Sequence, residues 1–319
     1  MMRIFWNSSE ARLRAGWRLA AQLAANLGLA ILVWWALRRA AGGLLQAAAW
    51  SDLARYAVLF AATLLTVAAA ARWLDRRPFA DLGLHPAARV WWADFAFGTV
   101  LAVVPIAALA LLAWACGWVT IRAAFVSGLV GVALGPALVV ALAQYLFVAF
   151  FEELARAYQI RNLWEGTRGR LGPIGGAVLA AVGATLVSVV MHAGPPLFLL
   201  FVFLDMAMYA LCYLLTGRIA IATGHHLVWD LLLSTVLVVE GVLPLNWAAA
   251  LFFVEPAEAV LSVLAAPRPG MIALAIAAIL AYEAVNVLLV WGWVRWRGGR
   301  PFIQGREVLP GPWARGAGV

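Results

Sequence analysis

Long apolar runs separated by short polar segments dominate the chain. Eight of them reach the roughly 20 mainly apolar residues that a membrane-spanning helix needs: 17–37, 56–73, 93–115, 132–155, 174–192, 197–216, 219–240 and 271–293. A mixed segment at 241–270, with Pro244 and Glu255, is expected to form a loop with a short interfacial helix. The first run is too long, and its leader too charged, for a signal peptide. The pattern predicts an all-α fold, a polytopic transmembrane helix bundle of about eight spans.

Composition supports a membrane location for these runs. The chain is 66% hydrophobic and only 12% charged, whereas a soluble domain carries about a quarter charged residues. This excludes a soluble globular enzyme and a disordered chain. Only two cysteines are present, Cys116 and Cys212, both in apolar stretches, so neither a disulfide scaffold nor a cysteine metal site is predicted.

The arginines predict how the chain is oriented in the bilayer. All 23 basic residues are arginine, giving a net charge of +8. They flank the apolar runs and form no basic face, so nucleic acid is not an expected partner. If both termini are cytoplasmic, 18 of the 23 lie on the cytoplasmic side, where arginine normally accumulates. We therefore expect a multi-pass protein of the cell inner (plasma) membrane, with the lipid bilayer as its surroundings and both termini in the cytoplasm.

A few ionisable residues lie inside the apolar runs. Each costs about 2.5–3.5 kcal/mol in a bilayer even on the mildest scale, so such residues usually have a function or a partner. They are Glu152, Glu153, His192, Asp205, His225, His226, Asp230 and Glu283.

Helical spacing sorts these groups into candidates. Residues four apart share a helix face, so Glu152 can pair with Arg156, and His226 with Asp230. His225 points about 100° away from His226 and is the weaker candidate. Carboxylates and imidazoles on separate helices supply the base, the proton relay and the carbonyl polariser that water activation needs.

Asp205 and Glu283 have no motif around them. We expect them to be structural partners of buried arginine, tyrosine or backbone groups.

Four blocks of sequence, in order, carry a family resemblance. They are RPFADLGL at 77–84 followed by Trp91 and Trp92, FEELARAYQIRNL at 151–163, SVVMH at 188–192, and TGR at 216–218 with GHHLVWD at 224–230. The blocks resemble the pre-core linker and motifs one to three of the CAAX protease and bacteriocin-processing (CPBP, or Abi) family of intramembrane proteases, which includes the type II CAAX prenyl endopeptidases. The core of the resemblance covers roughly residues 130–245.

The resemblance implies three parts of the chain. Residues 1–92 would hold two transmembrane helices and the family-like linker, and residues 93–245 the protease core. Residues 246–319 would hold a loop, the last transmembrane helix and a basic cytoplasmic tail.

The resemblance also implies roles for the site residues. Glu152 would activate the water, with Glu153 as its neighbour in the glutamate pair. Arg156 would be the motif-one arginine, and His192 would assist the water or bind a metal.

Motif three would act on the substrate carbonyl. His226 and Asp230 would polarise it and hold the developing oxyanion, or complete a metal site. Two options stay open: a divalent metal such as zinc, held by Glu152, His192 and His226, or a glutamate mechanism without metal.

Motif one is one residue shorter than in the family. Two residues separate Glu153 from Arg156 instead of three. An alignment anchored on the glutamate pair and one anchored on Arg156 therefore predict different helix faces for Glu152. If the helix ended at residue 155, Glu152 would also lie at the cytoplasmic rim, at a different depth from His192, unless the helix continues to about Trp164.

The leading functional hypothesis is an intramembrane endopeptidase acting on a peptide or protein substrate that reaches the membrane. Serine and aspartyl chemistries fit worse, because the chain has neither a Gly-x-Ser-x nucleophile facing a histidine nor a Gly-x-Gly-Asp motif. The alternatives are a catalytically inactive family member acting as an immunity or scaffold protein, or a proton-coupled transporter.

Overall fold

Helices make up most of the described chain. The structure, a computed structural model, describes residues 2–8, 10–41, 43, 48–192, 194–239, 248–258, 260, 262 and 268–297. The α-helices are α1 (Met2–Phe5), α2 (Ala15–Ala41), α3 (Ala48–Ala69), α4 (Arg89–Ala115), α5 (Leu134–Met191), α6 (Pro196–Thr216), α7 (Ala220–Leu231) and α9 (Pro269–Trp296). A π-helix (Ala70–Asp75) extends α3, and a 3-10 helix (Phe79–Leu82) follows it.

Within these described residues, six helices are long and apolar enough to cross a membrane. They are α2, α3 with its π-helical extension, α4, α5, α6 and α9. This confirms the all-α transmembrane bundle. Most predicted spans coincide with one of these helices, and the remaining differences concern 132–192 and 219–240.

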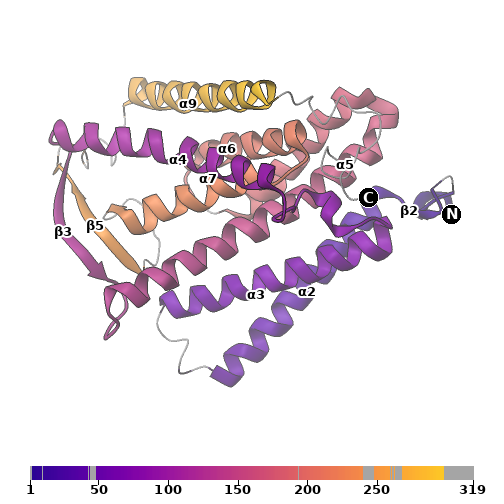
Figure 1. The fold of residues 1–319 in the computed structure, drawn as a ribbon, viewed down its shortest axis with the longest axis horizontal. Coiled ribbons are helices and arrows are strands. Elements are labelled where there is room, and N and C mark those ends of the chain that lie inside the picture. Colours follow the sequence, from indigo (N-terminus) through magenta and orange to yellow (C-terminus); the bar gives the residue numbers. More distant parts are fainter. Residues whose placement is uncertain are drawn as a thin grey trace.

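The predicted spans 132–155 and 174–192 are the two legs of α5, a hairpin that breaks at Gly172 (Figure 1). Gly172 has φ 72° and ψ 172°, a conformation essentially confined to glycine, and Pro173 cannot continue the helix. Trp164 Nε1 donates to the Pro173 carbonyl at 3.0 Å across the break. Small residues of the second leg, Ala177, Ala180 and Ala184, then pack in one apolar cluster with the first leg. The first leg thus continues well past the predicted end at residue 155.

The prediction of a full span at 219–240 is wrong. Helix α7 ends at Leu231, a π-helix covers Leu232–Val236, and strand β4 (Leu237–Val239) follows. The β-branched valines at the end of this run favour a strand once a partner strand is present. The apolar run is therefore divided between a helix and a sheet edge.

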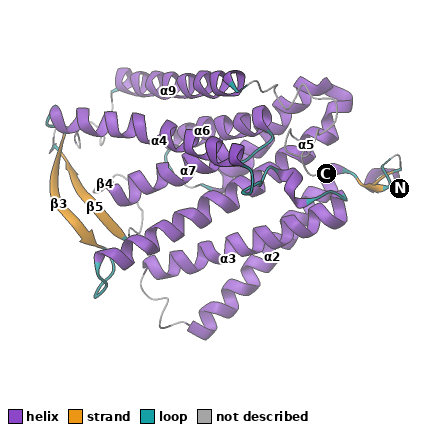
Figure 2. Cartoon of the chain, in the orientation of Figure 1, coloured by secondary structure: helices purple, strands orange, loops and turns teal. Residues whose placement is uncertain are grey.

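The partner strands form a sheet at the end of the bundle opposite β1 (Trp6–Asn7) and β2 (Arg12–Leu13) (Figure 2). Strand β3 (Val119–Ser127) pairs antiparallel with β5 (Ala249–Pro256), which pairs parallel with β4. The described part of 241–270 is thus largely a strand where a loop was predicted. Residues 240–247, 259, 261 and 263–267 lie outside the described residues.

Helices α4 and α7 approach each other closely, and two glycines permit the contact. A Cβ on Gly98 would collide with the Ile221 carbonyl, and a Cβ on Gly224 would collide with the Phe95 carbonyl. Gly224 directly precedes the two histidines of α7. The glycines therefore determine how closely α7, which carries these histidines, packs against α4.

Ion pairs hold the other end of the bundle together. Burial would lower the pKa of Arg77, but the neighbouring Glu165 carboxylate outweighs this and the pKa is raised. The shortest pairs are Arg18–Asp75, Arg77–Glu165 and Arg218–Asp94, each at 2.6 Å. They connect α2 to the π-helix, the resembling linker to the first leg of α5, and the turn between α6 and α7 to α4.

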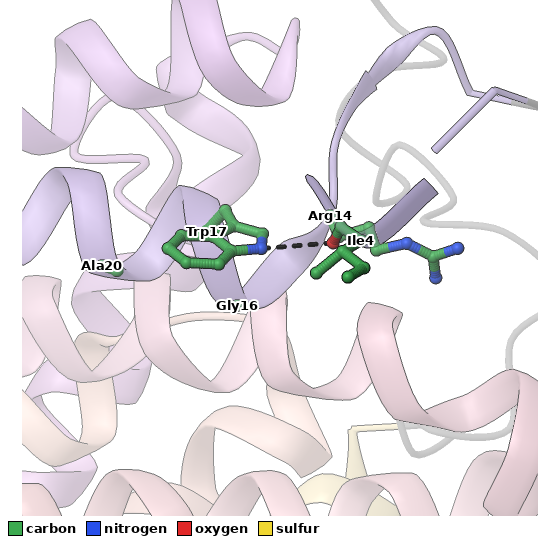
Figure 3. A pocket seen from close by; sticks show the side chains of 5 residues that line it. All are labelled: Ile4, Arg14, Gly16, Trp17 and Ala20. Carbon is green, nitrogen blue, oxygen red and sulfur yellow. Dashed lines mark hydrogen bonds between the residues drawn. The ribbon is translucent and has the colours of Figure 1, made fainter. Parts of the chain in front are cut away.

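A shallow hollow of about 390 Å³ lies where α1 meets α2 (Figure 3). Ile4, Arg14, Gly16, Trp17 and Ala20 line it, and Trp17 Nε1 donates to the Ile4 carbonyl at 3.2 Å. It contains none of the predicted site residues.

Candidate active site

Motifs one and three meet at a buried carboxylate. Glu153, on the first leg of α5, forms an ion pair with Arg156 one turn later. The same Glu153 oxygen, Oε1, lies 3.0 Å from Nδ1 of His226 on α7. All three side chains are almost completely buried. Because the ionised carboxylate only accepts hydrogen bonds, His226 Nδ1 carries the hydrogen of this contact.

Two more carboxylates lie on the accessible side of this cluster. Glu152 Oε2 is 3.9 Å from Arg156, and Asp230 Oδ2 is 3.5 Å from His226 Nε2. The side chains of Glu152 and Asp230 keep 19% and 25% exposure, against 3% for Glu153. The candidate active site is therefore accessible from the side that carries Glu152 and Asp230.

Arg156 joins the two legs of α5 to α6. Its Nη2 donates to Ser188 Oγ at 3.2 Å on the second leg of α5 and contacts the Met206 sulfur on α6. Its guanidinium also lies 5.4 Å from the centre of the Tyr209 ring, a cation–π distance. Arg156 was counted above with the cytoplasmic arginines, and this is wrong: sixteen residues of helix, about 24 Å, separate it from the break at Gly172.

Arg156 contacts both glutamates of the shortened motif. It reaches Glu153 three residues earlier and Glu152 four residues earlier. One arginine therefore contacts both glutamates. Ala157, at the arginine position of the other alignment, packs in the apolar cluster between the two legs.

The hairpin brings Glu152 and His192 to the same depth. Its two legs run antiparallel, and Arg156 and Ser188 lie side by side across them. Glu152 lies four residues before Arg156, and His192 four residues after Ser188, so both are displaced by about 6 Å in the same direction. His192 Nδ1 is within 2.8 Å of the Ser188 carbonyl, and both Glu152 and His192 act electrostatically on Asp230. The depth conflict expected from the sequence is thereby removed.

Tyr209 positions both histidines of α7. Its ring stacks on His226, with centroids 5.4 Å apart and planes at 22°, while its hydroxyl is 2.8 Å from His225 Nδ1. His225 Nε2 lies 3.0 Å from the Tyr282 hydroxyl on α9. His225 is thus occupied between two tyrosines and does not contact Glu153. Sequence reasoning missed Tyr209, and the only available signal was its place one turn after Asp205.

The residues suggested for a metal site do not fit one in this arrangement. Both ring nitrogens of His226 face carboxylates, Glu153 and Asp230. Among the described His, Cys, Asp and Glu side chains, no group of three or more is placed to hold a metal ion. We therefore assign no step below to a metal.

The fold and the site define a class of protein. It is a membrane helix bundle with a buried glutamate, arginine and histidine cluster that reaches an accessible carboxylate pair.

Comparison with known proteins agrees with this class. Residues 133–232 match the family model described as type II CAAX prenyl endopeptidase Rce1-like. The match covers α5, α6 and α7, and with them Glu152, Glu153, Arg156, His192, His226 and Asp230. This part of the chain is therefore similar to the type II CAAX prenyl endopeptidases, as the resemblance of its motifs predicts. Comparisons with curated proteins and with solved structures gave no match.

Proposed function

We propose that the protein is an intramembrane endopeptidase in which Glu152 activates a water molecule. The observation that carries this proposal is the contact of Glu153 with both Arg156 and His226. It places the motif-three histidine beside the glutamate pair and leaves Glu152 as the more accessible glutamate. The family match over the same residues points to peptidase chemistry.

The proposed reaction is a hydrolysis. Glu152 takes a proton from water, whose oxygen attacks the peptide carbonyl, and His192 at the same depth holds that water. His226 is an imidazolium in this scheme, since both of its ring nitrogens face carboxylates, and its Nε2–H donates to the oxyanion beside Asp230. Glu152 then passes the proton to the amide nitrogen, the C–N bond breaks, and a carboxylic acid and an amine leave.

Glu153 and Arg156 have a positioning role in this scheme. The hydrogen bond from His226 Nδ1 to Glu153 fixes the ring so that Nε2 faces the accessible side. Arg156 keeps Glu153 ionised and ties it to the second leg and α6.

The substrate class follows from the location of the site. The site residues lie on helices of an apolar bundle, so the scissile bond must be presented at the membrane. We propose a peptide or protein segment that partitions into the bilayer, such as a lipid-modified C-terminus. The bundle would lie in the inner membrane with both termini in the cytoplasm.

Purified full-length protein in detergent, incubated with quenched fluorogenic peptides, tests the proposal. One peptide carries a farnesylated C-terminal cysteine motif and its control is unprenylated. We expect the wild type to cleave one of them and the His226→Ala variant to lose this activity. Two results would contradict the proposal. One is equal cleavage by the wild type and the variant, and the other is that the folded wild type cleaves neither peptide.

A further inference from the structure

The hollow between α1 and α2 has an apolar end and a basic end (Figure 3). The Trp17 ring lies at one end, the Arg14 side chain extends from the other, and Ile4 lies between them. Gly16 and Ala20, one turn apart on α2, line the hollow with minimal side chains. A Cβ added at Gly16 would meet no atom within 4 Å. The hollow therefore has room for a ligand that combines an apolar part with an anionic group.

Contacts between α1 and α2 hold both ends of the hollow in place. Trp17 Nε1 donates to the Ile4 carbonyl at 3.2 Å, and the centre of its ring lies 4.7 Å from that of Phe5. The Arg14 backbone N–H donates to the Phe5 carbonyl at 2.9 Å. The Arg14 carbonyl accepts from the Arg18 N–H at 3.2 Å in the first turn of α2. The positions of Arg14 and Trp17 relative to each other are thus fixed by the fold.

The hollow lies at the boundary of a membrane-spanning helix. Helix α2 is long and apolar enough to cross a bilayer, and Gly16, Trp17 and Ala20 belong to its first two turns. Ile4, Phe5 and Trp17 are 63%, 46% and 43% exposed. Large apolar and tryptophan side chains of this kind are typical of the interface between lipid tails and headgroups. The amphipathic molecule that surrounds the hollow is therefore phospholipid.

The charges at this end of the bundle favour an anionic headgroup. Arg12 and Arg18, on either side of Arg14 in the chain, belong to a network of ion pairs. Among the described residues this network holds four arginines and three acids: Arg12, Arg18, Arg77 and Arg161 with Glu10, Asp75 and Glu165. Each acid lies within 4 Å of an arginine, and Arg14 adds a further positive charge. Such clusters at a membrane surface attract anionic lipids more strongly than zwitterionic ones.

We propose that the hollow binds one anionic phospholipid. Arg14 contacts the headgroup phosphate, and Trp17 and Ile4 contact the upper part of the acyl chains. The bound lipid fastens the N-terminal segment to the membrane surface at the arginine-rich end. The hollow contains none of the proposed catalytic residues, and the proposal does not depend on the proposed peptidase activity.

Native mass spectrometry of the full-length protein in detergent tests the role of Arg14. The probes are phosphatidylglycerol and phosphatidylcholine with identical acyl chains. We expect the wild type to bind one phosphatidylglycerol more tightly than phosphatidylcholine. Arg14→Gln should weaken phosphatidylglycerol binding about fivefold, the effect of one charge near the membrane surface. Arg89→Gln, which removes an exposed arginine at the first residue of α4, is the matched control and should bind like the wild type.

The variant Gly16→Leu tests the hollow itself. The added side chain starts in open space and occupies the hollow, so the protein should fold and lose the tightly bound phosphatidylglycerol. Gly28→Leu, at an exposed position further along α2 with equally open space, is the matched control and should keep the lipid.

Four results would overturn the proposal. Two are equal affinity of the wild type for both lipids, and unchanged phosphatidylglycerol binding by Arg14→Gln. The third is unchanged binding by the folded Gly16→Leu variant. The fourth is displacement of the lipid by inorganic phosphate, which would mean that the site takes a free anion. If Gly16→Leu does not fold, Arg14→Gln decides the question, because Arg14 is exposed and its side chain is not part of the core.

Discussion

The two adjacent glutamates of the candidate active site have different surroundings. Glu153 is buried against Arg156 and His226, whereas Glu152 keeps 19% of its side chain exposed and lies 3.9 Å from Arg156. One residue of helix rotates a side chain by about 100°, so neighbours in sequence face different environments. Glu153 is therefore suited to hold other side chains in place, and Glu152 to exchange a proton with water.

This difference predicts that two conservative substitutions lower stability to unequal extents. Glu153→Gln leaves the buried Arg156 without its close counter-charge, which costs about 3 kcal/mol. Glu152→Gln removes a longer and partly exposed contact, worth less than about 1 kcal/mol. Thermal denaturation of the purified variants, followed by size-exclusion chromatography, should show a clear loss for Glu153→Gln alone. Equal melting temperatures would contradict the assignment of Glu153 as the structural carboxylate.

Part of the site could be predicted from residue spacing. The pairs Glu152–Arg156 and His226–Asp230 follow from helical periodicity, and the meeting of His226 with the glutamate pair is in keeping with the ordered motifs. The role of Tyr209 could not be predicted. It depends on how α6 is rotated against α7, and single-chain periodicity does not specify this rotation.

At the scale of elements, the hairpin of α5 matters most for the site. The sequence pattern predicts two separate spans, which in the structure form one hairpin with a break at Gly172. The register of its two legs puts Glu152 level with His192. The break depends on a backbone conformation that other residues avoid.

Gly172→Ala should therefore weaken the fold through the backbone alone. No atom lies within 4 Å of the added Cβ, so the cost is the strain of positive φ, about 1–3 kcal/mol. Gly169→Ala, three residues earlier in the same leg with equally open space, is the control and should be neutral or stabilising. The prediction is checked by comparing the two melting temperatures, and it fails if both variants behave alike.

The close crossing of α4 and α7 gives a second prediction for elements. Gly98→Ala and Gly224→Ala each place a methyl group against a backbone carbonyl of the other helix, and overpacking of this kind costs about 1–3 kcal/mol. Because α7 carries His226, cleavage activity should fall as well. Gly28→Ala and Gly292→Ala, on α2 and α9, meet no neighbouring atom and should lower neither stability nor activity.

Helices could be predicted from the sequence better than strands. Runs of about 20 apolar residues identify helices by length, and six described helices follow this rule. The sheet could not be predicted, because β5 pairs with β3, which is distant in the chain, and the apolar run that ends in β4 also fits a helix. The end of α7 at Leu231 could not be predicted for the same reason, because the apolar run continues beyond it.

For the whole molecule, the two ends of the bundle differ in character. One end carries the ion pairs of Arg18, Arg77 and Arg218, and the other carries the sheet. The arginine-rich end corresponds to the proposed cytoplasmic side. Helix α4 runs from the arginine-rich end of the bundle to the end that carries the sheet. Cys116, directly after α4, therefore lies at the end proposed to face outward.

The two native cysteines test this orientation. Cys116 is exposed and Cys212 is buried in α6. A membrane-impermeant maleimide added to spheroplasts should label the wild type at Cys116 and should not label Cys116→Ser. In inside-out vesicles Cys116 should be protected. Labelling in inside-out vesicles alone would reverse the proposed orientation.

The proposed activation of water by Glu152 can be tested by the cleavage of one quenched peptide in ¹⁸O-labelled water. The proteins compared are the wild type, Glu152→Gln and the exposed-site control Glu255→Gln. Removing a general base slows a reaction by about 10²–10⁴-fold. We predict one ¹⁸O atom in the new C-terminal carboxyl group, a rate for Glu152→Gln at least about 100-fold below that of the wild type, and an unchanged rate for Glu255→Gln. A Glu152→Gln variant that cleaves the peptide at the wild-type rate would contradict a role of Glu152 as the general base.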